Sequence, residues 1–157
     1  MQLLAYPRES VSLDGIWQAI PDQYEIYEEY FEDFAGDDET LPKIYDPASS
    51  RATDRPTDFN IYDGRSVRIP ASLGEEIPEF RHFEGWVWYA TQFERSRLED
   101  GERTFLRFGA VNYKAEVWLN GERVGNHEGG FTPFSFEVTD LLCDGTNDLV
   151  VRVDNNR

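Results

Sequence analysis

The sequence has very little cysteine and no long apolar run. Cys143 is the one cysteine in 157 residues, so no disulfide can form within the chain. Its Leu-Leu-Cys-Asp-Gly context favours a small buried or half-buried thiol over a nucleophile or a metal ligand. No stretch approaches the roughly eighteen apolar residues of a membrane-spanning helix. The first ten residues, MQLLAYPRES, lack the basic region of a secretory signal. We therefore expect a cytoplasmic protein with no transmembrane helix.

Positive charge is also scarce. The chain has 31 Asp and Glu against 15 Lys and Arg, a formal net charge of −16, and its only lysines are Lys43 and Lys114. Such a chain is repelled by nucleic acids and by anionic membranes, so we expect neither as a partner. The acidic residues run from Glu9 to Asp154 instead of forming one tail. They could mark a local interaction surface, but we favour adaptation to concentrated salt, and hence a halophilic source.

Common motifs for metals, phosphates and nucleophiles are missing. His82 and His127 are far apart and have no Cys or carboxylate at ligand spacing, which argues against a metal site. Gly129-Gly130 is not followed by the Lys and Ser or Thr of a phosphate-binding loop. No Gly-x-Ser-x-Gly elbow occurs. We expect no metal and no cofactor.

The best-defined pattern is a hairpin near the middle of the second half. From Ala115 to Leu119, apolar and other residues alternate with the period of two of a β-strand. Asn120-Gly121 follows, and this dipeptide suits both central positions of a type I′ turn because both residues tolerate positive φ. The residues from Arg123 to Gly125 form the returning arm. The next four, 127–130, are too rich in glycine for a regular element, so we expect a loop there.

The early part of the chain has a different period. Tyr24, Tyr27, Phe31 and Phe34 recur at intervals of three and four among carboxylates, which predicts an amphipathic helix from about Asp22. We expect its aromatic face to pack on a sheet, although a sugar platform is the alternative. Residues 36–66 lack periodicity, and we expect an irregular acidic insert.

Short β-strands dominate the rest of the chain. Extended segments are predicted near Trp17, at 86–93, at 104–108, at 135–138 and at 148–154. In the segment at 104–108, Phe105 and Arg107 should face the opposite way from Leu106 and Phe108. About ten residues separate successive strands, which is typical of an all-β sandwich, here with one short amino-terminal helix. We expect a single domain over residues 1–157.

Six segments resemble one known family in order and spacing. They are SLDGIW (12–17), IPASLGE (69–75), FEGWVWYATQFE (83–94), LRFGAV (106–111), VWLNGERVGNHEGGFTPFSFEVTDLL (117–142) and VRVDNN (151–156). Together they resemble the amino-terminal sugar-binding domain of glycoside hydrolase family 2, and within it the β-glucuronidases. The resemblance covers nearly the whole chain except the acidic stretch between Pro21 and Ser66. It implies a jelly-roll fold of the galactose-binding-domain type.

The resemblance also implies that catalysis belongs to another domain. In this family an Asn-Glu pair supplies the acid/base within a (β/α)₈ barrel, and a second Glu is the nucleophile. No Asn-Glu dipeptide occurs in this chain. The family domain continues past the Asn-Asn motif, so we expect this chain to be truncated at its carboxyl end. We therefore expect a non-catalytic domain or fragment, inactive alone, that supports a barrel in cis or on an adjacent chain.

Six residues are candidates for contact with carbohydrate or with the barrel. They are Trp86, Trp88, Tyr89, His127, Glu128 and Asn155. The main alternative is a stand-alone lectin-like module that binds sugar through exposed aromatics such as Trp86 or Trp88. A third interpretation is an inactive remnant without a partner. An ordinary polar turn is an equal alternative for His127-Glu128. Whether the aromatics of 83–89 are buried or form a flat exposed platform separates the first two interpretations. An oligomer is also compatible with the sequence.

Overall fold

The computed structural model describes residues 10–22, 64–95 and 101–156. Apart from Asp22 itself, the helix predicted from about Asp22 to Phe34 lies outside these residues, as does nearly all of the predicted insert at 36–66. The described elements are β1 (Gly15–Pro21), β2 (Arg65–Ile69), α2 (Leu73–Glu76), η3 (Pro78–Phe80), β3 (Trp86–Arg95), β4 (Phe105–Phe108), β5 (Lys114–Leu119), β6 (Glu122–Glu128), β7 (Phe134–Glu137), η4 (Thr139–Leu141) and β8 (Gly145–Asp154).

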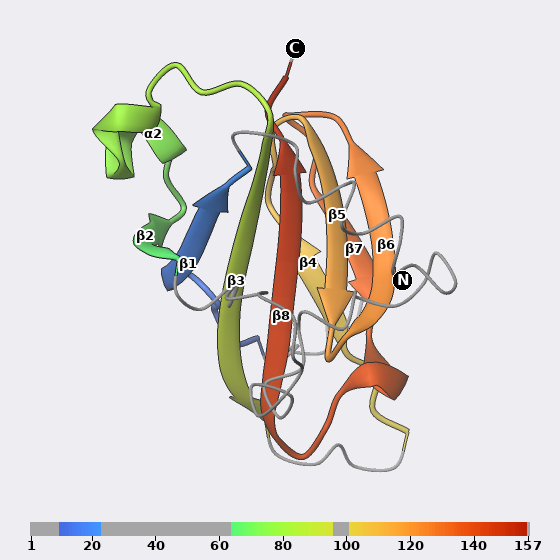
Figure 1. Ribbon diagram of the computed structural model, residues 1–157. Helices are drawn as coiled ribbons and strands as arrows, with labels where there is room; N and C mark the ends of the chain where they lie inside the picture. The colour runs from blue at the N-terminus through green and yellow to red at the C-terminus, as the bar shows by residue number, and fades with distance from the viewer. Residues whose placement is uncertain (1–9, 23–63, 96–100, 157) are drawn as a thin grey trace, which may run out of the picture.

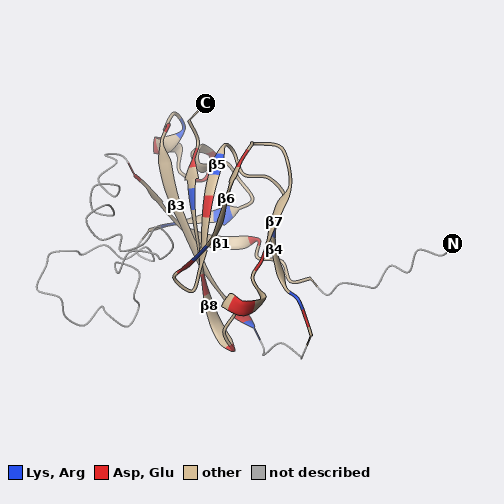
Figure 2. Ribbon diagram, turned by 90° about the vertical axis from the view of Figure 1, so that its right-hand side faces the viewer, with Lys and Arg blue, Asp and Glu red and all other residues tan. Residues whose placement is uncertain are grey.

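The strands form two layers, as the prediction of an all-β sandwich requires. Six strands make one antiparallel sheet in the order β2-β1-β3-β8-β5-β6, and β4 pairs with β7 in a two-stranded sheet. Figure 2 shows the two-stranded sheet lying to one side of the larger sheet. The last strand of the chain, β8, lies in the interior of its sheet, between β3 and β5. This two-layered arrangement fits the jelly roll that the family resemblance implies.

The core lies between the two layers. On the large sheet it includes residues of the central strands that face the small sheet, among them Ala19, Val87, Val117 and Val151, each at most 3% exposed. These residues pack with partly buried residues of the small sheet, such as Phe136. On β4, Leu106 and Phe108 are half-buried whereas Phe105 and Arg107 are exposed. The prediction that these two pairs face opposite sides of the strand is confirmed.

The predicted hairpin is present, but its second strand is longer than predicted. Asn120 and Gly121 both have positive φ, 54° and 88°, as a type I′ turn requires. β6 continues through His127 and Glu128, which pair with Ala115 and Lys114. The expected loop at 127–130 was therefore wrong for its first two residues, because pairing with β5 outweighs the nearby glycines.

The segment before β3 was not anticipated. Arg65 and Ser66, at the end of the predicted irregular insert, belong to β2 and pair with β1. The short helices α2 and η3 then form a compact connection at the upper left of Figure 1. None of the helices in the described part of the chain is long and apolar enough to cross a membrane.

Candidate functional site

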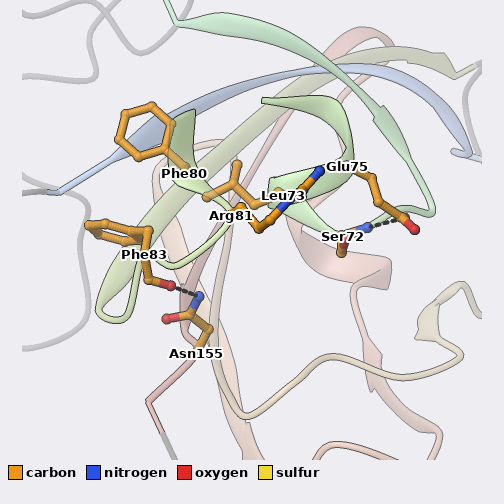
Figure 3. Close-up of a pocket in the computed structure, with 8 residues that line it drawn as sticks. Ser72, Leu73, Glu75, Phe80, Arg81, Phe83 and Asn155 are labelled. Atoms are coloured by element: carbon orange, nitrogen blue, oxygen red, sulfur yellow. Dashed lines mark hydrogen bonds between the residues drawn. The ribbon is translucent and has the colours of Figure 1, made fainter. Parts of the chain in front are cut away.

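An open cleft of about 420 Å³ lies between the α2–η3 connection and the end of β8. Its lining residues are Ser72, Leu73, Gly74, Glu75, Phe80, Arg81, Phe83 and Asn155. Figure 3 shows Phe80 and Phe83 on one side, Ser72 and Glu75 on the other, and Arg81 between them. The two phenyl rings meet edge to face, with centroids 5.7 Å apart. The cleft therefore combines an aromatic wall with one cationic side chain.

Asn155, one of the predicted site residues, holds the floor of this cleft. Its amide nitrogen donates to the carbonyl of Phe83 at 2.8 Å, and its amide oxygen accepts from the N–H of Gly85 at 2.7 Å. Both ends of the side-chain amide are thus used within the fold. Asn155 is a positioning residue, because it ties the end of β8 to the turn that precedes β3.

The wall opposite the phenyl rings is tightly packed. A Cβ atom added to Gly74 would lie 2.6 Å from the Cα of Arg81, closer than side chains approach backbone. The carboxylate of Glu75 accepts a hydrogen bond from the backbone N–H of Ser72 at 3.4 Å, which fixes the first turn of α2. Glycine at position 74 lets α2 lie directly against the chain that carries Arg81.

The carboxylates of this connection are engaged with other groups. Glu76 accepts a hydrogen bond from the backbone N–H of Arg68 at 2.8 Å. Glu79 forms an ion pair with Arg65 at 3.1 Å. Among the residues that the structure describes, Arg81 makes no ion pair with any carboxylate. A chain with a net charge of −16 thus presents one uncompensated guanidinium in its cleft.

Trp86 and Trp88, the aromatic candidates, do not form an open platform. They lie on the face of the large sheet that is turned away from the small sheet. Trp88 is only 4% exposed and stacks on Trp118, with ring centroids 5.7 Å apart. The guanidinium of Arg152 lies over Trp86 at 3.9 Å from the ring centroid. Arg152 also approaches Glu116 at 3.5 Å. These contacts make the tryptophans part of a packed charged and aromatic cluster.

Tyr89 lies on the opposite face of the same strand. It packs against the core between the sheets, next to residues such as Val87 and Val151. Burial raises the pKa of its phenol to about 12, because the charged phenolate would lose hydration there. Tyr89 therefore keeps its proton at neutral pH and contributes to packing.

His127 and Glu128 lie at the end of β6. The His127 ring stacks on Phe134 with centroids 4.0 Å apart, and its Nε2 is 3.3 Å from the hydroxyl of Thr132. Glu128 is exposed and pairs across the sheet with Lys114. His127 thus fastens the glycine-rich loop onto the small sheet.

Strand register brings several predicted residues to one end of the sandwich. Trp86 pairs with Asp154, Asp154 with Lys114, and Lys114 with Glu128, so these four residues form one row across β3, β8, β5 and β6. Asn155 follows directly after this row. The row lies at the upper end of Figure 1, where β3 begins and β6 and β8 end. Tyr89 and Trp88 lie further along β3.

The cleft residues Arg81, Phe80 and Leu73 were not among the candidates from the sequence. The signal that could have found them is weak: Pro78 and Gly74 interrupt the strand pattern just before the tryptophan-rich strand. Three or more His, Cys, Asp or Glu side chains do not come together as a possible metal site anywhere in the described residues. Of the described residues that line the cleft, one carries a carboxylate, Glu75.

The fold defines a class, the galactose-binding-like β-sandwich, and comparison with known proteins supports this assignment. The profile described as "Glycosyl hydrolase 2 galactose-binding domain-like" matches residues 77–157, more than half of the chain. The chain belongs to this family and corresponds to the amino-terminal sugar-binding domain of a family 2 glycoside hydrolase.

The individual relatives are β-glucuronidases. The β-glucuronidase of the dog, Canis lupus familiaris, is 33% identical over 153 residues, which are 90% of this chain and 21% of the relative. A solved β-glucuronidase of an uncultured Clostridium species superposes with a TM-score of 0.67 at 30% identity, over 97% of this chain and 24% of that chain. The Lactobacillus rhamnosus enzyme gives 0.67 at 28% identity, over 96% and 22%. The chain thus spans between a fifth and a quarter of these relatives.

Proposed function

We propose that this chain is the non-catalytic support of a β-glucuronidase-type enzyme and that a (β/α)₈ barrel outside it breaks the glycosidic bond. The observation that carries the proposal is the alignment of 90% of the chain with only 21% of a β-glucuronidase. The domain would form part of the wall beside the barrel. Its partners would then be a glycoside and that barrel.

The chemistry of the cleft supports a non-catalytic role. Glycosidic hydrolysis by the usual two mechanisms needs two carboxyl groups on opposite sides of the scissile bond. Among the described residues, the cleft offers only Glu75, whose carboxylate already accepts the N–H of Ser72. A single carboxylate held by backbone cannot act as both acid and nucleophile.

The packing of Trp86 and Trp88 favours this proposal over a stand-alone lectin-like module. Such a module needs flat aromatic faces open to a sugar, whereas Trp88 stacks on Trp118 and Arg152 covers Trp86. These contacts join side chains of β3, β5 and β8 on the outer face of the large sheet. The same contacts leave little aromatic surface on this strand for a sugar ring.

An activity assay tests the proposal. The purified chain is incubated with chromogenic glucuronide and galactoside substrates, and a β-glucuronidase relative serves as the positive control. We expect no turnover by the chain. A hybrid in which this chain replaces the matching part of the Clostridium enzyme should hydrolyse the glucuronide. Turnover by the chain alone that is abolished by one Glu→Gln substitution would contradict the proposal.

A further inference from the structure

The turn between β5 and β6 carries the only Asn-Gly dipeptide of the sequence, Asn120-Gly121. Asparagine before glycine is prone to spontaneous deamidation, because glycine has no side chain to hinder attack by its backbone nitrogen on the asparagine side chain. Both residues are half-buried, so water reaches the turn. A reactive dipeptide and its co-reactant, water, therefore meet at this end of the hairpin.

The closed turn holds the Asn120 side chain at both ends of its amide. The nitrogen donates to the Leu141 carbonyl at 2.7 Å and to Oδ1 of Asn147 at 2.8 Å, and the oxygen accepts from the N–H of Asp148 at 2.9 Å. Deamidation needs Cγ of Asn120 to move to bonding distance of the Gly121 nitrogen. A side chain held in this way cannot make that movement without giving up its hydrogen bonds. The reaction therefore requires the turn to open first.

The same surroundings do not suit the product. Aspartate at this position would turn a carboxylate oxygen, in place of the amide nitrogen, towards two acceptors, the Leu141 carbonyl and Oδ1 of Asn147. Asn147 is fully buried and cannot reverse its amide to donate instead. Its oxygen accepts from the N–H of Cys143 at 2.8 Å, and its nitrogen donates to the carbonyls of Cys143 and Gly145 at 3.0 Å. A part-buried carboxylate facing acceptors is unfavourable, so the modified side chain favours the open turn.

We propose that Asn120 is a site of spontaneous deamidation, which the closed β5–β6 turn protects and local opening of the turn exposes. The Gly121 nitrogen loses its proton to solvent and bonds to Cγ of Asn120, and the side-chain nitrogen leaves as ammonia. Water then adds to one carbonyl carbon of the resulting succinimide and breaks one of its two C–N bonds. The product at position 120 is aspartate or isoaspartate, and isoaspartate has one extra carbon in the backbone.

The isoaspartate product also disturbs strand pairing. Leu119 pairs with Glu122 directly across the two-residue turn. An added backbone carbon lengthens this turn, which no longer matches the register of the two strands. Neither product returns to asparagine, so the reaction converts a reversible opening into a permanent loss of native protein. This proposal is independent of carbohydrate binding and of hydrolysis.

The test compares deamidation of the 157-residue chain at mildly alkaline pH in buffer and in guanidinium chloride that unfolds it. Peptide mass spectrometry detects the change from amide to carboxylate at position 120, and chromatography separates aspartate from isoaspartate. We expect the reaction to be at least about tenfold slower in buffer, because only molecules with an open turn react. Asn156, exposed in the folded chain, is the internal control and should react at similar rates in both solutions. Equal rates at Asn120 in the two solutions overturn the proposal, as does the absence of deamidation there in the denaturant.

Two substitutions test the effect of the product without the reaction. Asn120→Asp should unfold at a lower urea concentration than the unmodified chain or fail to fold, because its carboxylate faces the two acceptors. Asn156→Asp adds the same charge at an exposed position after β8 and should unfold like the unmodified chain. Equal urea midpoints for the two variants overturn the claim that the product favours the open turn.

Discussion

At the residue scale, neighbouring side chains of one strand have different roles because they face different layers. Trp88 faces the outer side of the large sheet and stacks on Trp118, whereas Tyr89 faces the core. Both were chosen from the sequence as residues that contact sugar or the barrel. Their burial instead gives them packing roles in this domain, and burial of a phenol has a measurable consequence.

We predict that Tyr89 makes stability fall at high pH. The phenol titrates near 10 in the unfolded chain and at about 12 in the folded one. Because the folded state holds this proton more tightly, its contribution to stability is fully present below pH 10. It is lost as the pH rises towards 12, at about 1.4 kcal/mol per pH unit.

Urea unfolding between pH 9 and pH 12 measures this effect. Tyr89→Phe lacks the proton, so its free energy of unfolding should fall less steeply with pH than that of the unmodified chain. Tyr113→Phe, at a tyrosine that is 38% exposed, is the matched control. Parallel curves for the unmodified chain and Tyr89→Phe would show that this phenol does not contribute.

At the scale of elements, the hairpin of β5 and β6 is held at its turn by one asparagine. The Asn120 amide nitrogen donates to the Leu141 carbonyl at 2.7 Å and to the Asn147 side chain at 2.8 Å, and its oxygen accepts from the Asp148 N–H at 2.9 Å. Asn147, fully buried, in turn accepts from the backbone N–H of Cys143. The turn is thereby joined to the start of β8.

We predict that Asn120→Gly lowers the free energy of unfolding by about 2–3 kcal/mol, because three side-chain hydrogen bonds are lost. Asn120→Ala should cost about 1 kcal/mol more, since alanine is strained at the positive φ of this position. Urea unfolding at neutral pH measures both variants. Equal values for the two variants would contradict the assignment of strain, and losses below about 0.5 kcal/mol would contradict the hydrogen-bond argument.

The loop after β6 shows why local composition can mislead. The glycine content around His127 predicted a loop at 127–130, yet β6 continues through His127 and Glu128. Backbone pairing with Ala115 and Lys114 stabilises these residues, and the His127 ring stacks on Phe134. Such partners come from other strands and cannot be read from the glycines.

At the scale of the whole molecule, charge is the dominant feature. Figure 2 shows acidic residues at both ends of the sandwich. With a net charge of −16, self-repulsion opposes the compact state, and salt screens it. The Debye length falls from about 30 Å at 0.01 M to about 3 Å at 1 M. This spread of charge supports our proposal of a halophilic source.

We therefore predict that the melting temperature rises with KCl into the molar range, by an amount equivalent to several tenths to a few kcal/mol. Differential scanning calorimetry at 0.01, 0.1 and 1 M KCl measures the rise. A variant with Glu84→Gln, Glu122→Gln and Asp140→Asn, three exposed carboxylates, should show a smaller rise. A flat or falling curve for the unmodified chain would remove the argument for salt adaptation.

The sequence by itself determined the strand pattern, the type I′ turn and the family. The alternation from Ala115 to Leu119 and the positive-φ residues Asn120 and Gly121 depend on neighbours in the chain, so local chemistry was sufficient to predict them. The family followed from six segments whose order and spacing are properties of the chain alone.

Only the tertiary structure decided which residues form the cleft and which tryptophan faces are covered. Asn155 reaches Phe83 across 72 positions of sequence, and strand order places β8 between β3 and β5. Arg81 stands out only because Glu75, Glu76 and Glu79 are held by other groups. The physical reason is that pairing between distant strands and long-range hydrogen bonds set these contacts, and the periodicity of one strand does not encode its partner.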